Sequence, residues 1–353
     1  MVLMIITACA RPPDPDTGPI SSPGEGHPPP SSARLANGSQ TPPGPVADPH
    51  QGPTGLSPNE LGRIPILVYH QVGDREGRWM RRWDNFARDL QALYDRGYRL
   101  VSLNDYLDGR LSLPAGYSPV ILTFDDSSRG QFNYLLKDGR EAEDSPPVVD
   151  PHSAVGVLLD FYRSHPDFGL EATFYFNASP FGQPELWKEK LRFLLEQGLD
   201  LGNHTDYHVN LARATSEEVR RALAAPVKIL EEVAPGYRLT SLALPYGAWP
   251  ADSRLAVEGE FQGVRYSHRG ILLVGAAPAP SPYSLQYDPL RLPRIQAFSP
   301  ELERWLDYLD RHPDDRYVSD GDPEIISFPV KLQGKLNQAA VKGKQVLPLI
   351  TGQ

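Results

Sequence analysis

Two short groups of residues have side chains that could bind a metal ion and activate water. Asp125 and Asp126 directly follow the apolar run 118–124, and two adjacent carboxylates require a nearby cation or a raised pKa. His204 and His208 are four residues apart, a spacing that predicts a helical turn with both imidazoles on one face, able to reach one ion. Taken singly, each group also fits a plainer interpretation: an Asx turn or helix cap for the aspartates, and a surface pair for the histidines.

A third group, Pro245-Tyr246-Gly247 with Trp249 close behind, follows another short apolar run. By itself it is typical of an ordinary turn at the end of a strand. All three groups come at the carboxyl ends of predicted strands, which is where the active sites of parallel α/β proteins gather.

The elements that must position these groups alternate along the chain between apolar strands and amphipathic helices. Strands are predicted over 63–69, 99–103, 118–124, 172–177, 199–203, 241–244, 263–267, 271–274 and 292–297, and helices over 83–97, 155–165, 184–197, 216–233 and 301–309. Pro226 is expected to kink or divide the fourth of these helices. The alternation predicts an α/β fold with a parallel sheet or barrel. Phosphate-loop, dinucleotide-loop and nucleophile-elbow patterns are missing from the sequence, which disfavours nucleotide enzymes and the common serine hydrolases.

Composition separates this folded part from a different amino-terminal segment. Of the 49 residues in 10–58, 14 are Pro and 7 are Gly, and none is aromatic. Such a segment cannot bury enough apolar surface to offset the entropy of ordering it, so a disordered linker is predicted over 10–62 and a folded domain over 63–353. Within that domain we expect an insertion at 127–170, directly after the aspartates, and a carboxyl-terminal extension after residue 299.

The bulk numbers exclude several classes of protein. The single Cys among 353 residues excludes a disulfide framework and a zinc site built from several thiolates. A net charge of −9 argues against a nucleic-acid partner, because phosphate neutralisation needs a basic face. The sequence contains no run of 18 apolar residues, so no internal membrane-spanning helix is predicted.

The single cysteine, Cys9, ends the apolar stretch 1–9, and Ile6-Thr7-Ala8-Cys9 resembles the lipobox of bacterial lipoproteins. Two interpretations compete: Cys9 is incidental, or 1–9 is a truncated signal segment and Cys9 is the lipidated amino terminus. We favour the second, because a long linker after the Cys is what an enzyme tethered to a membrane needs. It implies an extracytoplasmic protein of the bacterial cell envelope, in contact with the membrane only through its lipid.

The order of the three groups resembles that of the polysaccharide deacetylases of the NodB-homology type, over about residues 65–297. Members of this family are metal-dependent carbohydrate esterases that remove N-acetyl groups from sugars, and their fold is a distorted (β/α) barrel. The resemblance implies that Asp126, His204 and His208 bind a divalent ion, zinc in most of the family, and that Asp125 is the catalytic base.

The residue types make chemical sense of this resemblance. Two His and one carboxylate leave positions on a divalent ion for water and substrate, so the ion can acidify the water and polarise the acetyl carbonyl while Asp125 takes the water proton. On the substrate side we place Pro245, Tyr246 and Trp249, with a backbone N–H near Tyr246 facing the oxyanion and two aromatic faces for a sugar ring.

The sequence departs from the usual family pattern in two places. The late strand 292–297 lacks the His that commonly protonates the leaving amine, but His70 ends the first strand, as in the deacetylases of poly-N-acetylglucosamine, where the motif order is circularly permuted. We therefore assign His70 as the acid, with His268 as the competing candidate and a plain turn residue as the alternative. Ala243 stands where the family often has an Arg that pairs with the catalytic Asp. Arg294, which we place among the substrate-site residues, is the best placed arginine to take over that pairing.

Two other functions fit part of the pattern. A catalytically inactive glycan-binding module could keep the same fold, although the presence of Asp125 beside a full ligand set disfavours it. A non-haem iron oxygenase also uses two His and one carboxylate, but it does not need the second aspartate, and its usual barrel is all-strand. The expected function is therefore metal-dependent hydrolysis of N-acetyl groups on a cell-surface or extracellular polysaccharide that contains N-acetylglucosamine.

Overall fold

The computed structural model describes residues 54–136 and 147–350. The predicted lipobox with Cys9 and most of the predicted linker lie outside these residues. Within them, no helix has the length and apolar character needed to cross a bilayer. The linker was predicted to reach residue 62, but its last part is packed: Asn59 forms a β-bridge with Val318, and the backbone N–H of Glu60 donates to the carbonyl of Ser327 (2.7 Å).

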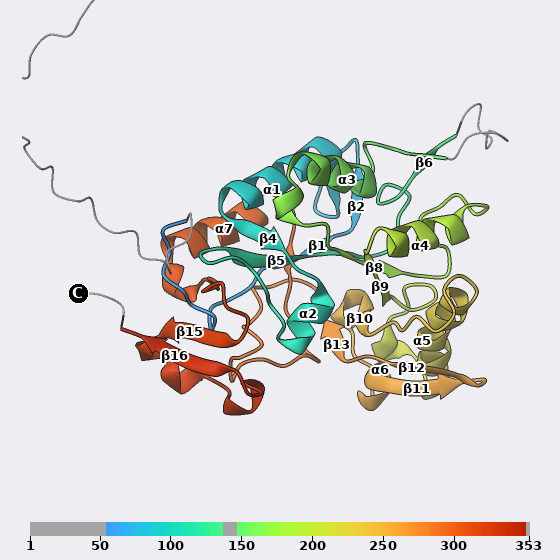
Figure 1. The fold of residues 1–353 in the computed structure, drawn as a ribbon. Helices are drawn as coiled ribbons and strands as arrows, with labels where there is room; N and C mark the ends of the chain where they lie inside the picture. Colours follow the sequence, from blue (N-terminus) through green and yellow to red (C-terminus); the bar gives the residue numbers. More distant parts are fainter. Residues whose placement is uncertain (1–53, 137–146, 351–353) are drawn as a thin grey trace, which may run out of the picture. The chain divides into compact units, whose positions relative to one another are not determined.

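A curled sheet forms the centre of the protein (Figure 1). Its strands are β1 (Ile66–Tyr69), β4 (Tyr98–Leu100), β5 (Ser118–Phe124), β8 (Thr173–Phe176), β9 (Asp200–Asn203), β10 (Ser241–Ala243), β13 (Gly270–Leu272) and β14 (Ile295–Gln296). The order is β13-β10-β9-β8-β5-β1-β14, with β4 beside β5, and every pairing is parallel. One further parallel bridge, between Leu272 and Leu292, links β13 to the segment that leads into β14. The predicted distorted (β/α) barrel is therefore confirmed.

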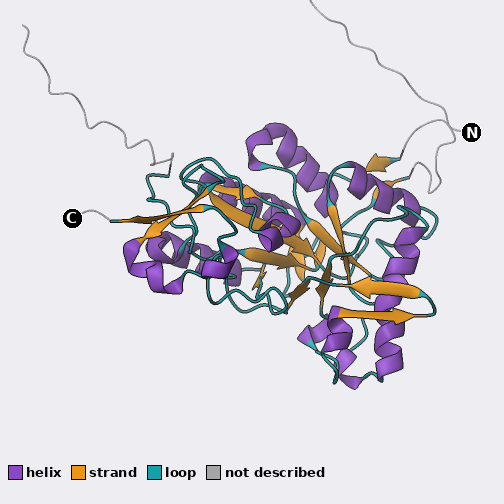
Figure 2. Cartoon of the chain, turned by 60° about the horizontal axis from the view of Figure 1, so that its bottom comes forward, coloured by secondary structure: helices purple, strands orange, loops and turns teal. Residues whose placement is uncertain are grey.

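The strands are apolar because the sheet is covered on both sides. All seven residues of β5 are buried, and the ring of Phe124 stacks on that of Phe174 in β8 at a centroid distance of 4.7 Å. Figure 2 shows the strands running through the middle of the molecule with helices around them. Parallel pairing places the carboxyl ends of β5, β9 and β10 at one edge, so the three motifs of the sequence meet there.

The helices that cover this sheet are α1 (Trp83–Asp95), α2 (Leu103–Asp108), α3 (Ala154–Ser164), α4 (Trp187–Glu196), α5 (Ser216–Glu231), α6 (Arg254–Val257) and α7 (Glu301–Arg311). α1 buries Phe86, Leu90 and Leu93 on one face, and Gly97 after its end has a φ of 76°, as the predicted cap requires. Helix α5 begins with a capping box between Thr215 and Glu218. It continues past Pro226 without division.

Among the described residues, four pairs of short strands lie outside the barrel sheet. They are β2 (Gln71–Gly73) with β3 (Met80–Arg82), β6 (Tyr134–Leu135) with β7 (Val148–Val149), β11 (Glu258–Phe261) with β12 (Val264–Ser267), and β15 (Ile325–Pro329) with β16 (Gln345–Leu349). Of these eight strands only β12 was predicted, and helices α2 and α6 were missed as well. β6 and β7 lie within the expected insertion, and β15 and β16 within the expected extension.

Candidate metal centre and active site

Asp125 and Asp126 are adjacent in sequence, but their side chains have different partners. The backbone N–H of Asp125 still donates to the carbonyl of Tyr69 in β1 (2.9 Å), so this residue continues the sheet. Asp126 and Ser127 then have φ values of 76° and 45°, a left-handed turn that Asp tolerates better than most residues. The turn gives the two carboxylates different partners. Burial and the charge of Asp125 would raise the pKa of Asp126, but its contact with His204 holds this pKa below the usual value.

Asp125 forms a two-pronged ion pair with Arg294. The two guanidinium nitrogens lie 2.8 and 2.7 Å from the two carboxylate oxygens, and the side chains of Arg294 and Asp125 are 0% and 2% exposed. Burial alone would raise the pKa of Asp125, but the charges of Arg294, His204 and His70 hold this pKa below its usual value. Arg294 was assigned to the substrate site; with no exposed surface, it acts through Asp125 rather than by touching a substrate.

Asp126, His204 and His208 come together at the same edge, with one possible ligand atom from each within 4.8 Å of the others. The Nε2 atoms of His204 and His208 lie 3.2 and 3.5 Å from Asp126 Oδ1. The predicted helical turn between the histidines is wrong: Thr205 and His208 have φ values of 65° and 54°. A left-handed turn brings the two imidazoles together instead.

The hydrogen bonds of His204 show that this cluster fits a cation. Its Nδ1 lies 2.8 Å from the carbonyl oxygen of Ala243, and because a carbonyl only accepts, Nδ1 carries the proton. A neutral His204 therefore turns the lone pair of Nε2 toward the carboxylate oxygen of Asp126, where two acceptors face each other. A proton or a metal ion would resolve this contact. Although burial opposes a charged His204, its contact with Asp126 and the nearby Asp125 raise its pKa above the usual value.

His70 lies beside these carboxylates because β1 and β5 are neighbouring strands with Tyr69 opposite Phe124. Burial lowers the pKa of His70, while the negative charges of Asp125 and Asp126 oppose this shift. The competing candidate, His268, is 1% exposed and lies between the carbonyl of Ala256 (2.8 Å) and the side chain of Asn203 (3.1 Å). Of the two histidines, only His70 is partly exposed and next to the aspartates.

The third motif forms one wall of the site. Tyr246 has a φ of 60° and is 65% exposed, and its ring lies edge-on to that of His208 at a centroid distance of 4.5 Å. Pro245 is buried, so it shapes the turn and offers little surface to a ligand. Trp249 is half-buried against the guanidinium of Arg291, 4.9 Å from its ring.

One positioning residue was not found from the sequence. The side-chain nitrogen of Gln131, which is fully buried, donates to the backbone carbonyls of both His70 and Asp125. It thereby ties the ends of β1 and β5 together from within the predicted insertion. Glutamine in a polar loop gives no signal of such a role, because one of the two carbonyls that it bridges, that of His70, lies 61 residues away in sequence.

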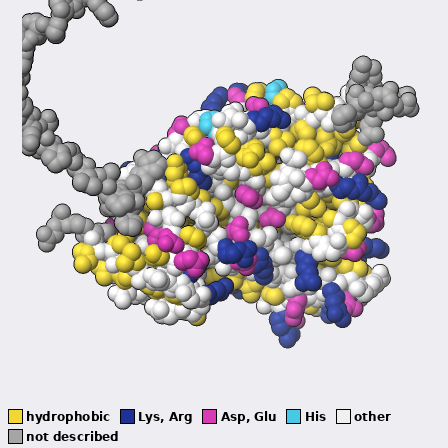
Figure 3. Space-filling model, viewed as in Figure 1, with side chains coloured by type: hydrophobic (Ala, Val, Ile, Leu, Met, Phe, Trp, Pro, Cys, Tyr) yellow, Lys and Arg dark blue, Asp and Glu magenta, His cyan; other side chains and the backbone are white. Residues whose placement is uncertain are grey.

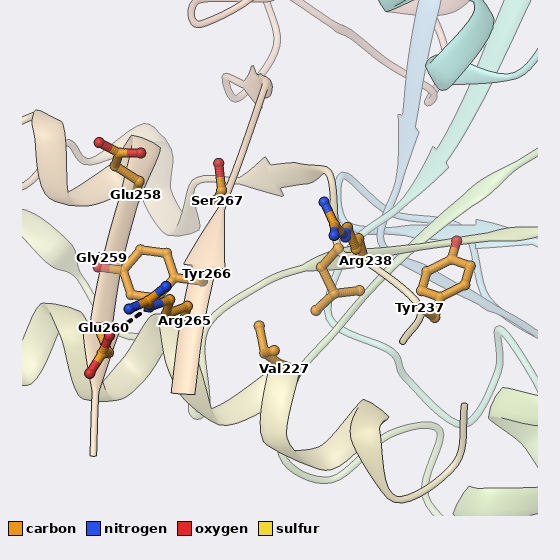
Figure 4. Close-up of a pocket in the computed structure, with 10 residues that line it drawn as sticks. Val227, Tyr237, Arg238, Glu258, Gly259, Glu260, Arg265, Tyr266 and Ser267 are labelled. Atoms are coloured by element: carbon orange, nitrogen blue, oxygen red, sulfur yellow. Dashed lines mark hydrogen bonds and ion pairs between the residues drawn. The ribbon is translucent and has the colours of Figure 1, made fainter. Parts of the chain in front are cut away.

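A hollow of about 770 Å³ lies elsewhere, between α5 and the β11–β12 hairpin (Figure 4). Tyr237, Arg238 and Tyr266 line it, and Arg265 at its rim pairs with Glu260. None of the predicted site residues lines this hollow, so it is separate from the metal centre. On the face drawn in Figure 3, acidic and basic side chains are interspersed.

Comparison with known families supports the resemblance in the motifs. Residues 158–261 match the family model of the polysaccharide deacetylases. A chitin deacetylase of Arthroderma benhamiae is 28% identical over 99 residues, which are 28% of this chain and 26% of the relative. YxkH of Bacillus subtilis is 20% identical over 201 residues, or 56% of this chain and 61% of the relative. This chain therefore aligns with less than two thirds of either curated relative.

Solved structures share the fold. The deacetylase PplD of Streptococcus pyogenes, solved in complex with acetate, has a TM-score of 0.51 and 20% identity, covering 69% of this chain and 97% of PplD. BC0361, a polysaccharide deacetylase from Bacillus cereus, has the same TM-score and 16% identity, covering 69% of this chain and 68% of its own. The family match over residues 158–261 bears out the predicted resemblance to the polysaccharide deacetylases, and the solved structures show a shared fold.

Proposed function

We propose that this chain, which has the polysaccharide deacetylase fold and matches that family over residues 158–261, hydrolyses N-acetyl groups on a polysaccharide containing N-acetylglucosamine. The observation that carries the proposal is the pairing of two units at one sheet edge. Asp126, His204 and His208 converge as a ligand set, and Asp125 is held charged beside them by Arg294. An inactive glycan-binding module would not need a buried, charged base next to a complete ligand set.

The three converging residues would hold a divalent ion, and we propose zinc, a metal suited to imidazole and carboxylate ligands. When bound, such an ion would lower the pKa of a water molecule and polarise the acetyl carbonyl. His204 is prepared for this role, because the bond from Nδ1 to Ala243 fixes its tautomer and ring orientation.

Asp125 is suited to take the proton of the attacking water. Its lowered pKa keeps it ionised at neutral pH, and each of its oxygens retains a lone pair beyond the bond to Arg294. His70, on the neighbouring strand, is placed to protonate the leaving amine. Tyr246, beside His208, presents an exposed ring and a turn backbone toward the substrate. The acetate in the PplD complex is the product expected of this chemistry.

We further propose that the enzyme works outside the cytoplasm on a cell-surface or extracellular glycan, held to the membrane by a lipid on Cys9. The long Pro- and Gly-rich segment after Cys9 would let the domain reach a polymer away from the bilayer. Mass spectrometry of protein extracted from membranes tests this part, because an unmodified Met1 would contradict lipidation.

An acetate-release assay on N-acetylglucosamine oligomers, with and without a chelator, tests the activity. We expect acetate from the untreated enzyme, none after chelation, and recovery when zinc is restored. A glycan-binding module would bind the oligomers and release no acetate under any of these conditions. Chelator-resistant acetate release would contradict the proposed role of Asp126, His204 and His208.

A further inference from the structure

An exposed tryptophan lies next to the proposed acid. Trp79 ends the loop between β2 and β3, and its ring lies edge-on to the ring of His70 at a centroid distance of 4.6 Å. The side chain is 44% exposed, and the guanidinium of Arg78 lies 5.1 Å from the ring centroid. The indole of Trp79 is therefore partly open to solvent beside His70, with the guanidinium of Arg78 near one of its faces.

A narrow cleft opens beside the same two rings. It is lined by His70, Trp79 and Gln296, among others, and has a volume of about 10 Å³, about enough for a single water or hydroxyl oxygen. Gln296 is 9% exposed, and its Oε1 is buried with no hydrogen-bond partner among the residues that the structure describes. A buried amide oxygen without a partner is costly, so a donor from outside the chain is expected there.

The position of Gln296 is fixed by its surroundings. It lies opposite Val68 in the β1–β14 pairing, as the last residue of β14. Gly275 leaves room for its side chain, since a Cβ at this glycine would come within 2.8 Å of Gln296 Cγ. Gln296 thus lies at the end of β14, beside both Gly275 and the cleft.

We propose that Trp79 and Gln296 form a sugar subsite next to the catalytic centre. The apolar face of a pyranose ring would lie on Trp79 while one of its hydroxyls donates to Gln296 Oε1. Tyr246 lies on the other side of the centre, against His208. The inference rests on the proposed function and deepens it: the substrate is an internal sugar of a glycan polymer, with neighbouring sugars on both sides.

Binding measurements test the subsite without requiring turnover. The probes are N-acetylglucosamine and its pentamer, titrated calorimetrically into the full chain with Asp125→Asn. Adding Trp79→Ala to this background should weaken pentamer binding about ten-fold, and Gln296→Met several-fold. Tyr162→Ala, which removes a similarly exposed ring on α3, is the matched control and should leave the affinity unchanged.

Kinetics on the otherwise unaltered enzyme provides the second readout. We expect Trp79→Ala to lower the ratio of kcat/KM for the pentamer to that for the monosaccharide about ten-fold, and Trp79→Phe to restore part of it. Equal losses on both substrates would overturn the subsite and make Trp79 a support for His70. Unchanged pentamer affinity in Gln296→Met would overturn the role of its oxygen. Binding without any acetate release would instead contradict the proposed function and leave the subsite standing.

Discussion

Two buried carboxyl groups in this protein respond to burial in opposite ways. Asp125, at the carboxyl edge of the barrel, pairs with Arg294, and its pKa is held below the usual value. Glu60 accepts hydrogen bonds from Tyr317 (3.0 Å) and from the backbone of Ser327 (3.3 Å), and burial together with the charge of Asp320 raises its pKa from 4.5 to about 8. Both groups are almost completely buried.

The difference lies in the partners. A guanidinium in two-pronged contact compensates a buried carboxylate, whereas a hydroxyl and an amide do not. The protein therefore has a charged carboxylate where chemistry needs a base. It has a largely neutral carboxyl where Glu60 joins the start of the described chain to β15. The same residue class serves catalysis in one region and packing in the other.

The largest expected effect is a loss of turnover when the carboxylate of Asp125 is removed, with no such loss when Glu60 is changed. Asp125→Asn removes the base, so turnover should fall about a thousand-fold in acetate-release assays. Glu60→Gln keeps the shape of a neutral carboxyl far from the metal ligands, and its turnover should stay within two-fold of the wild type. A similar loss in both variants would mean that Asp125 contributes to the fold rather than to the chemistry.

A second test concerns Arg294, whose charge holds the pKa of Asp125 below its usual value. Arg294→Met leaves a buried charge without a partner and should cost about 3–5 kcal/mol in the free energy of unfolding, measured by urea titration. The pKa of Asp125 should then rise, so the acid limb of the kcat/KM profile should move to higher pH.

The matched control for Arg294 is Arg316→Met. Arg316 is also buried and pairs with Asp310, and it is not among the residues that line the cleft beside His70. We expect a comparable loss of stability with an unshifted pH profile. An acid limb that moves equally in both variants would show that Arg294 acts only through stability.

The smallest effect is the pH dependence from Glu60. Because its folded-state pKa is raised, its contribution to stability is fully present below about pH 4.5 and is lost as the pH rises toward about 8. The free energy of unfolding should therefore fall by a few kcal/mol between about pH 5 and pH 8, and Glu60→Gln should reduce that fall. Glu324→Gln, at an exposed carboxylate just before β15, should leave the slope unchanged.

Much of the barrel could be predicted from sequence because its strands are short apolar runs with clear ends. β5 has the predicted bounds, and α1 ends at its predicted glycine cap. Short pairs such as β15 and β16 were missed because two-stranded contacts carry little periodic signal. Residues 58–62 were assigned to the linker because composition does not show that Glu60 finds partners more than 200 residues away.

The site was predicted by residue type more than by geometry. His204 and His208 do converge on Asp126, but through left-handed residues that the spacing rule for helices does not anticipate. Arg294 lies at Asp125 as proposed, although its burial excludes direct contact with a substrate. Gln131, Trp79 and Gln296 escaped notice because their places beside His70 depend on how loops and strand ends fold together, which residue type alone does not show.

The division of work between the two adjacent aspartates is the central claim, and metal content measured beside acetate release tests it most directly. We expect one divalent ion per chain in the wild type and in Asp125→Asn, and none in Asp126→Asn or His204→Ala, with substantial acetate release only in the wild type. A full metal complement in Asp126→Asn, or its loss in Asp125→Asn, would contradict the account.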